Sequence, residues 1–156
     1  AMLEEFVFRG VIYRILEGRF GTNIALIQAL IFGVAHYPNV NATITAVWFV
    51  VMLGVVLSLM YTYTQRLWLP IFFHLSWNFA QTVYGTPLSG DTNFYALLSS
   101  KFNGPSLFIG SEFGLEDSFF SILFMTLLAM YFYWLCKKKG KFKSYQYRKV
   151  LGIDFS

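Results

Sequence analysis

The most constraining feature of the sequence is an uncharged run at residues 42–63, about 22 residues without Asp, Glu, Lys or Arg. As a helix rising about 1.5 Å per residue, it would reach about 33 Å, enough to cross a hydrocarbon core about 30 Å thick. Aromatic residues stand towards both of its ends, and Gln65 and Arg66 follow it. This pattern predicts a membrane-spanning helix at residues 42–65.

Four other apolar segments predict further helices. Hydrophobic residues make up 56% of the 156 residues and aromatic residues 21%, which is not a soluble composition. We therefore predict an all-α, polytopic transmembrane bundle of about five hydrophobic helices, in one domain at residues 1–136. The four helices are expected at residues 3–17, 23–37, 69–84 and 118–136.

Basic residues are concentrated after the last apolar segment, at residues 137–156. We predict that this segment is a cytoplasmic tail that contacts anionic lipid head groups, because cytoplasmic flanks of membrane helices are rich in Lys and Arg. The protein is then a multi-pass membrane protein with the acidic loop at residues 85–117 on the opposite side, and no nucleic acid is expected as a partner. The tail contains Lys137, Lys138, Lys139, Lys141, Lys143, Arg148 and Lys149.

Three charged residues lie close together in the first helix, where ionisable groups are costly and need a partner or a function. Glu5 and Arg9 are four residues apart, with the acid first, which favours a helical ion pair. Glu4 points about 100° away around the helix and has no local counter-charge. Glu4 is therefore a candidate general base.

The only two histidines lie on two other predicted helices. His36 follows Phe32 by one turn, and Asn78 follows His74 by one turn on the same face. A lone histidine is usually a structural residue, and a Glu-Glu-Arg cluster is usually a solvated helix face. In an apolar chain, however, the set combines a base, two imidazoles and an amide, which are the groups needed for hydrolysis.

The three polar clusters resemble the motifs of the CPBP family, which comprises CAAX proteases and bacteriocin-processing (Abi) enzymes and includes the type II CAAX prenyl endopeptidases. EEFVFR corresponds to EExxxR, FGVAH to FxxxH and HLSWN to HxxxN, in the family's order and within about half of the chain. The resemblance implies an intramembrane endopeptidase. The chain is then expected to be the C-terminal catalytic part of a longer, eight-helix-like bundle.

The resemblance also implies a role for each motif residue. Glu4 would activate water with the help of His36, while His74 and Asn78 would polarise the scissile carbonyl and stabilise its oxyanion. The supporting residues would be Glu5, Arg9 and Phe32.

A metal-dependent mechanism is the alternative. Glu4, His36 and His74 would supply three ligands for a catalytic zinc and leave one position open. The two histidines are not spaced as in HExxH, and Asn is a poor zinc ligand. We favour a mechanism without a cofactor and keep zinc as the alternative.

Two questions of function stay open at this point. The substrate would be a membrane-anchored protein or peptide, either a CAAX-type prenylated protein or a bacteriocin- or pheromone-like peptide. The competing function is a non-catalytic immunity or scaffold protein of the same fold, and a transporter is a weaker third. The loop at residues 85–117 could cover the site, but a surface excursion is the favoured interpretation.

Overall fold

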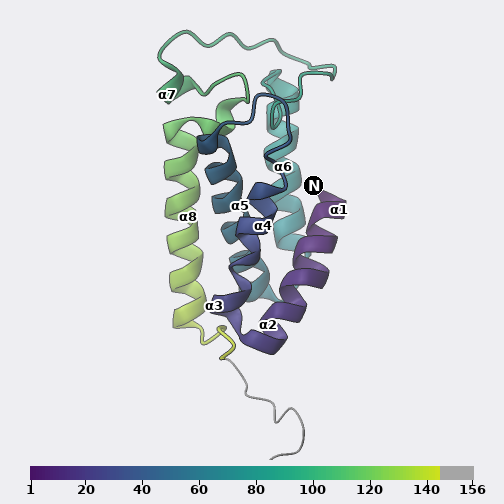
Figure 1. The fold of residues 1–156 in the computed structure, drawn as a ribbon, viewed down its shortest axis with the longest axis vertical. Coiled ribbons are helices and arrows are strands. Elements are labelled where there is room, and N and C mark those ends of the chain that lie inside the picture. Colours follow the sequence, from purple (N-terminus) through teal and green to yellow (C-terminus); the bar gives the residue numbers. More distant parts are fainter. Residues whose placement is uncertain (145–156) are drawn as a thin grey trace, which may run out of the picture.

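The computed structural model describes residues 1–144, and across these residues it is helical with no β-strand. Long helices form a bundle that carries a loop-rich cap at one end (Figure 1). The predicted all-α fold is thereby confirmed for the described part of the chain. The elements are α1 (Met2–Glu5), η1 (Phe6–Tyr13), α2 (Arg14–Phe20), α3 (Thr22–Ala25), α4 (Gln28–Val34), α5 (Ile44–Thr64), α6 (Trp68–Tyr84), α7 (Ser106–Ile109), η2 (Leu115–Asp117) and α8 (Phe119–Lys138).

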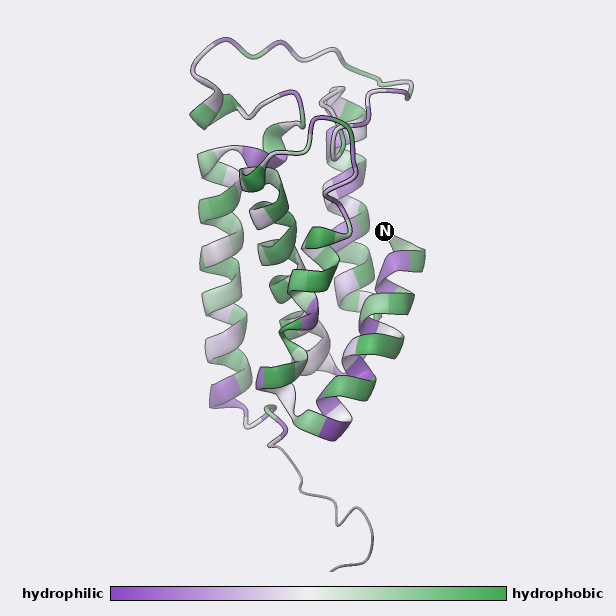
Figure 2. Cartoon of the chain, viewed as in Figure 1, coloured by the Kyte–Doolittle hydropathy of each residue, from purple (hydrophilic) through white to green (hydrophobic). Residues whose placement is uncertain are grey.

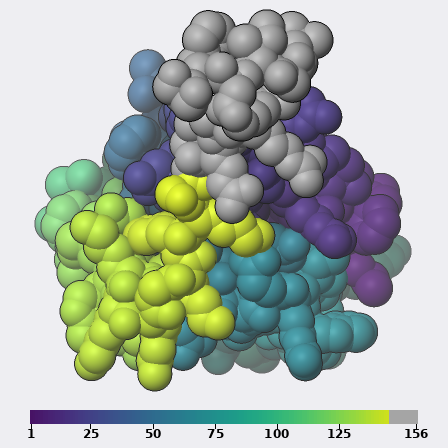
Figure 3. Space-filling model, turned by 90° about the horizontal axis from the view of Figure 1, so that it is seen from below, coloured from purple at the N-terminus to yellow at the C-terminus, as the bar shows by residue number. Residues whose placement is uncertain are grey.

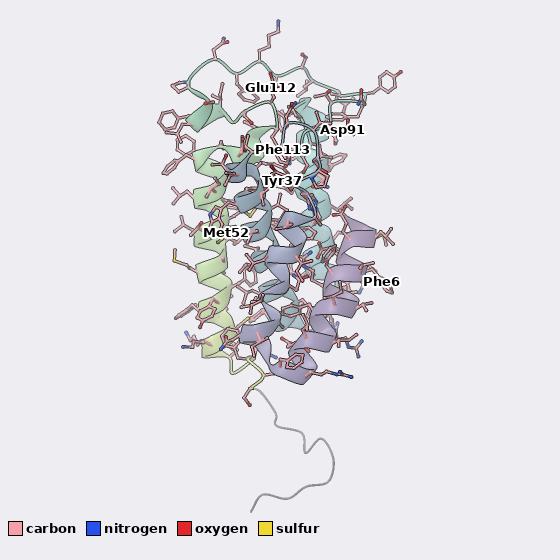
Figure 4. The ribbon with its side chains drawn as sticks, in the orientation of Figure 1. Phe6, Tyr37, Met52, Asp91, Glu112 and Phe113 are labelled. Carbon is pink, nitrogen blue, oxygen red and sulfur yellow. The ribbon has the colours of Figure 1, made fainter. Side chains whose placement is uncertain are left out.

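Two helices in the described range are long and apolar enough to cross a membrane, α5 and α8. Helix α5 runs through the middle of the bundle and supplies most of the hydrophobic core, whereas α8 is largely exposed. Apolar residues are also frequent along the other helices (Figure 2), and many of their side chains are exposed. Phe6 points away from the bundle (Figure 4). A soluble monomer rarely exposes so much contiguous apolar surface, so this exterior fits a lipid environment.

The first two predicted helices differ from the observed ones in detail. Elements α1, η1 and α2 form one continuous helix, in which η1 has the wider π-helical hydrogen bonding. The second predicted helix, 23–37, is broken into α3 and α4 by a turn at residues 26–27, where i→i+3 hydrogen bonds tighten the chain. His36 therefore lies just beyond α4 rather than in its last helical turn.

Helices α4 and α5 approach each other closely because glycines stand where they meet. A Cβ added at Gly33 would overlap the side chain of Val51 and lie 3.0 Å from the carbonyl oxygen of Val47. A Cβ added at Gly54 would lie 3.1 Å from Cβ of Ala29. This contact brings the segment before His36 against the core helix.

We expect Gly33→Ala to lower the free energy of unfolding by about 1–3 kcal/mol, because the added methyl group overpacks the α4–α5 contact. Gly18→Ala is the matched control. Gly18 is helical with no atom within 4 Å of an added Cβ, so alanine should raise the stability there by roughly 0.5–1 kcal/mol. Denaturant titration of the purified protein in detergent measures both changes. Effects of the same sign would contradict this account of the contact.

The segment after α8 is fastened to the opposite end of the bundle from the cap. Nζ of Lys143 donates to Oε2 of Glu17 at 2.8 Å, and Glu17 is buried. The carboxylate also accepts hydrogen bonds from Thr22 and Thr62, at 3.1 and 2.8 Å. Seen from this end, the segment lies against N-terminal elements and the region of α5 and α6 (Figure 3). The rest of the predicted tail, with Arg148 and Lys149, lies outside the described residues.

The two ends of the bundle carry different charges. The end of α2, the start of α6 and the end of α8 meet at one end (Figure 1), and the basic residues Arg19, Arg66 and Lys137 lie in or beside these elements. The loop between α6 and α8 is at the other end, where Asp91 and Glu112 lie (Figure 4). The bundle is thus polarised along its long axis.

Candidate active site

The centre of the site is a buried carboxylate shared by two helices. Oε1 of Glu5, at the end of α1, accepts a hydrogen bond from Nη1 of Arg9 at 2.9 Å. The same oxygen is 2.9 Å from Nδ1 of His74, which lies two turns into α6. Glu5 and Arg9 are fully buried, and His74 is nearly so. One carboxylate therefore joins the first motif to the third.

Arg9 extends this network to the core helix. Its Nη2 donates to the carbonyl oxygen of Gly54 at 3.0 Å. Its guanidinium carbon also lies 4.3 Å from the ring centroid of Phe32, a cation–π distance. The three predicted supporting residues, Glu5, Arg9 and Phe32, are thus in contact with one another through Arg9.

Glu4 lies on the open side of His74. Its Oε2 is 3.7 Å from Nε2 of His74, and its side chain is 42% exposed. This separation is too long for a direct hydrogen bond, and a water bonded to both atoms would lie to one side of the line between them. Because Nδ1 of His74 is hydrogen-bonded to Glu5, Nε2 is the ring nitrogen that is left to interact with a substrate. Nε2 faces Glu4.

His36 is held next to this group without touching its carboxylates. Its Nδ1 is 2.8 Å from the carbonyl oxygen of Phe32, and the two rings are 4.8 Å apart. The Phe32 ring also lies 6.3 Å from the ring of His74, so it stands beside both imidazoles. Among residues 1–144, no hydrogen bond or ion pair joins His36 to Glu4.

Asn78 follows His74 by one turn on α6 and is partly buried. Its side-chain amide makes no hydrogen bond to any other described residue, so both its donor and its acceptor groups are free. An unengaged amide next to a histidine can donate to an oxyanion.

The alternative metal site needs three ligands that converge on one point. Within the part of the chain that the structure describes, no three His, Cys, Asp or Glu side chains do so. Glu4 and His74 lie close together, but His36 does not join them. The present arrangement therefore does not fit a three-ligand zinc site, and no chemical step is assigned to a metal.

The contact between Glu5 and His74 could not be found from the sequence. Spacing identified the pair of Glu5 with Arg9, but it gave Glu5 no part beyond that pair. The predicted topology also placed Glu4 on the side of the membrane away from the cytoplasm and His74 near the cytoplasmic side. The structure removes this conflict because the first helix begins partway along the bundle, beside α6 (Figure 1).

Comparison with known proteins gives one family match. The family model described as "Type II CAAX prenyl endopeptidase Rce1-like" matches residues 1–80, about half of the chain. No curated protein and no solved structure matches the chain. The matched stretch contains all three motifs and ends within α6, the helix that carries His74 and Asn78.

Proposed function

Since the chain belongs to the type II CAAX prenyl endopeptidase Rce1-like family of membrane proteases, we propose that it is an intramembrane endopeptidase whose catalytic base is Glu4. The observation that carries this proposal is the placement of Glu4 and Glu5 on either side of the His74 ring. One carboxylate holds the imidazole, and the other faces its second ring nitrogen at a distance of 3.7 Å.

The proposed reaction begins with a water that contacts both Glu4 and His74 from the open side of the site. Glu4 accepts a proton from this water, and the oxygen attacks the scissile carbonyl carbon. The oxyanion that forms accepts hydrogen bonds from Nε2–H of His74 and from the amide of Asn78. Glu4 then gives the proton to the leaving amine as the C–N bond breaks.

The supporting residues hold this geometry. Glu5 accepts Nδ1–H of His74 and stabilises its doubly protonated imidazolium form, whose Nε2–H can then donate to the oxyanion. His36, with Nδ1 engaged by the carbonyl of Phe32, keeps Nε2 available to assist Glu4 at the water. Arg9 fixes Glu5 to the core helix.

We further propose that the protein crosses the membrane several times with its basic end in the cytoplasm. The gathering of basic residues at one end and acidic residues at the other supports this orientation. The lysines of the tail would contact anionic lipid head groups. The substrate would be a CAAX-type prenylated protein or a bacteriocin- or pheromone-like peptide.

The test is hydrolysis of a panel of prenylated and unprenylated C-terminal peptides by the full-length protein in lipid vesicles. We expect the wild type to cleave at least one peptide and Glu4→Gln to lower kcat/KM by at least about 10²–10⁴-fold, because the base is lost. Glu4 is partly exposed, so the variant should unfold at the wild-type temperature.

Two outcomes would overturn parts of this proposal. Full activity of Glu4→Gln, or no cleavage of any peptide by the wild type, would remove the protease function and favour the non-catalytic scaffold. Loss of wild-type activity with a chelator, restored by zinc, would overturn the metal-free mechanism.

A further inference from the structure

The loop of the cap contains an apolar segment at residues 94–109, FYALLSSKFNGPSLFI, which we name the cap segment. Nine of its 16 residues are apolar or aromatic, and Lys101 is its only charged residue. Its large apolar side chains are mostly exposed rather than packed on the bundle, with exposed fractions of 47–106% at Tyr95, Leu97, Leu98, Phe102, Leu107 and Phe108. A concentration of exposed apolar side chains marks a surface that binds protein or membrane.

The level of the cap segment relative to a membrane follows from α8. Its 20 residues, rising about 1.5 Å each, give a length of about 30 Å, which equals the thickness of a hydrocarbon core. At its basic end, Nζ of Lys138 lies 4.7 Å from the ring centroid of Trp134, and such aromatic and basic residues are typical of a membrane interface. The first turn of α8, with Phe119 and Phe120, then lies at the opposite interface.

Helix α7 lies next to this first turn of α8 (Figure 1). The ring centroids of Phe108 and Phe120 are 5.8 Å apart. From Phe120 onwards, exposed apolar residues recur every three or four positions and so form one face of α8. Helix α7 therefore extends a face that lipid would cover. The exposed residues of this face are Phe120, Leu123, Phe124, Leu127, Tyr131 and Trp134.

The backbone of the cap segment limits how deep it can lie. Residues 92–105 form no helix or strand, so they lack the internal hydrogen bonding of a regular element. Irregular backbone exposed to lipid does not occur within the hydrocarbon core, because its polar groups would have no partners there. At the head-group level, water and head groups can bond the backbone while aromatic and aliphatic side chains reach the acyl chains. The segment therefore suits the interface and not the core.

We propose that the cap segment is an interfacial membrane anchor in the leaflet opposite the basic end of the bundle, with Leu107 and Phe108 of α7 inserted among the acyl chains next to the head groups. A single cation, Lys101, gives little attraction to anionic lipid, so a zwitterionic bilayer is a sufficient partner. The inference goes beyond the proposed protease function and does not depend on it. It rests on α8 crossing the membrane.

The anchor is coupled to the helix that carries His74. Glu116 is buried, and its Oε1 accepts hydrogen bonds from Nε1 of Trp77 at 3.2 Å and from Nε2 of Gln81 at 3.0 Å, both on α6. Its Oε2 accepts from the hydroxyl of Ser89 at 2.8 Å. These bonds fix the loop to α6, so an anchored cap would also set the depth of the active site in the membrane.

Site-specific labelling of the full-length protein in phosphatidylcholine vesicles tests the anchor. Cys136 is fully buried, so a cysteine-reactive fluorophore should label only an added surface cysteine, and the wild type is the blank. Leu97→Cys and Leu107→Cys place the label on the cap segment. If the wild type takes up label, the same variants are made on Cys136→Ala.

Two matched positions give the reference signals. Leu127→Cys replaces a 53% exposed residue near the middle of α8 and reports the hydrocarbon core. Glu112→Cys replaces an exposed charged residue three positions after α7 and reports water. Each labelled protein is measured with aqueous iodide and in vesicles whose lipids carry bromine either near the head group or near the end of the acyl chain.

An interfacial anchor predicts a specific order of quenching. Bromine near the head group should quench the labels at 97 and 107 at least about twofold more than bromine near the chain end, because an interfacial segment is buried only about 5–10 Å into the head-group/acyl boundary. The label at 127 should show the reverse order. The label at 112 should be quenched mainly by iodide.

Three results would overturn the anchor. The first is iodide quenching at 97 or 107 as strong as at 112, which would place the segment in water. The second is protection of both labels from iodide without quenching by either bromine, which would place the segment against protein, such as a second copy of the chain. The third is a label at 127 that bromine does not quench, since α8 would then lie outside the bilayer. No peptide is hydrolysed in this experiment, so a failure of the protease proposal leaves the anchor standing.

Discussion

Replacing Glu5 with alanine is expected to lower the free energy of unfolding by about 3–5 kcal/mol. The change removes the only carboxylate that contacts Arg9 in residues 1–144 and leaves a fully buried guanidinium without a counter-charge. It also removes the hydrogen-bond partner of Nδ1 of His74. Equilibrium unfolding of the purified protein in mixed detergent, followed by circular dichroism, measures the loss.

The double variant Glu5→Ala/Arg9→Met tests whether the cost comes from the unpaired charge. Removing both charges should recover much of the lost stability, because apolar replacement of a buried ion pair is often close to neutral. The carbonyl oxygen of Gly54 would lose Arg9 but keep its hydrogen bond from Ser58 at 2.8 Å. A double variant no more stable than Glu5→Ala would show that the charge is not the cause.

The parts of the fold that the sequence predicted are those set by local pattern. The uncharged run at residues 42–63 could only be a long helix, and α5 occupies most of it. Spacing of four residues predicted the pair of Glu5 with Arg9, and the structure shows that contact. Neither inference needs knowledge of how helices pack together.

The sequence could not predict features that depend on packing between distant elements. The Glu5–His74 contact joins residues 69 positions apart, and helical periodicity does not say which helices become neighbours. The break in the segment at residues 23–37 was missed because its apolar pattern continues through the turn.

The loop at residues 85–117 is a second case in which local pattern was insufficient. The sequence favours a surface excursion for this loop, and residues 91–109 are indeed mostly exposed. In the structure Glu116 is buried against α6, while Asp117 accepts hydrogen bonds from Thr43 and Ser111. These carboxylates fasten the loop to the bundle. This role follows from the residues that surround each carboxylate in space, which the sequence does not give.

The second large effect concerns the position of His74. We expect His74→Ala to lower kcat/KM by about 10²–10³-fold, the usual cost of losing one oxyanion donor. Glu5→Gln should lower kcat by about tenfold or more with KM unchanged, because an amide no longer holds Nδ1–H as a carboxylate does. Steady-state kinetics on the peptide that the wild type cleaves gives both values.

The double variant Glu5→Gln/His74→Ala distinguishes positioning from general support. If Glu5 acts through His74, then Glu5→Gln should change kcat by less than about twofold once the imidazole is gone. If Glu5→Gln costs as much in the His74→Ala background as in the wild type, Glu5 affects activity only through the stability of the bundle. Glu5 would then be a structural partner of Arg9 alone, and the orientation of His74 would have to come from its packing against Phe32.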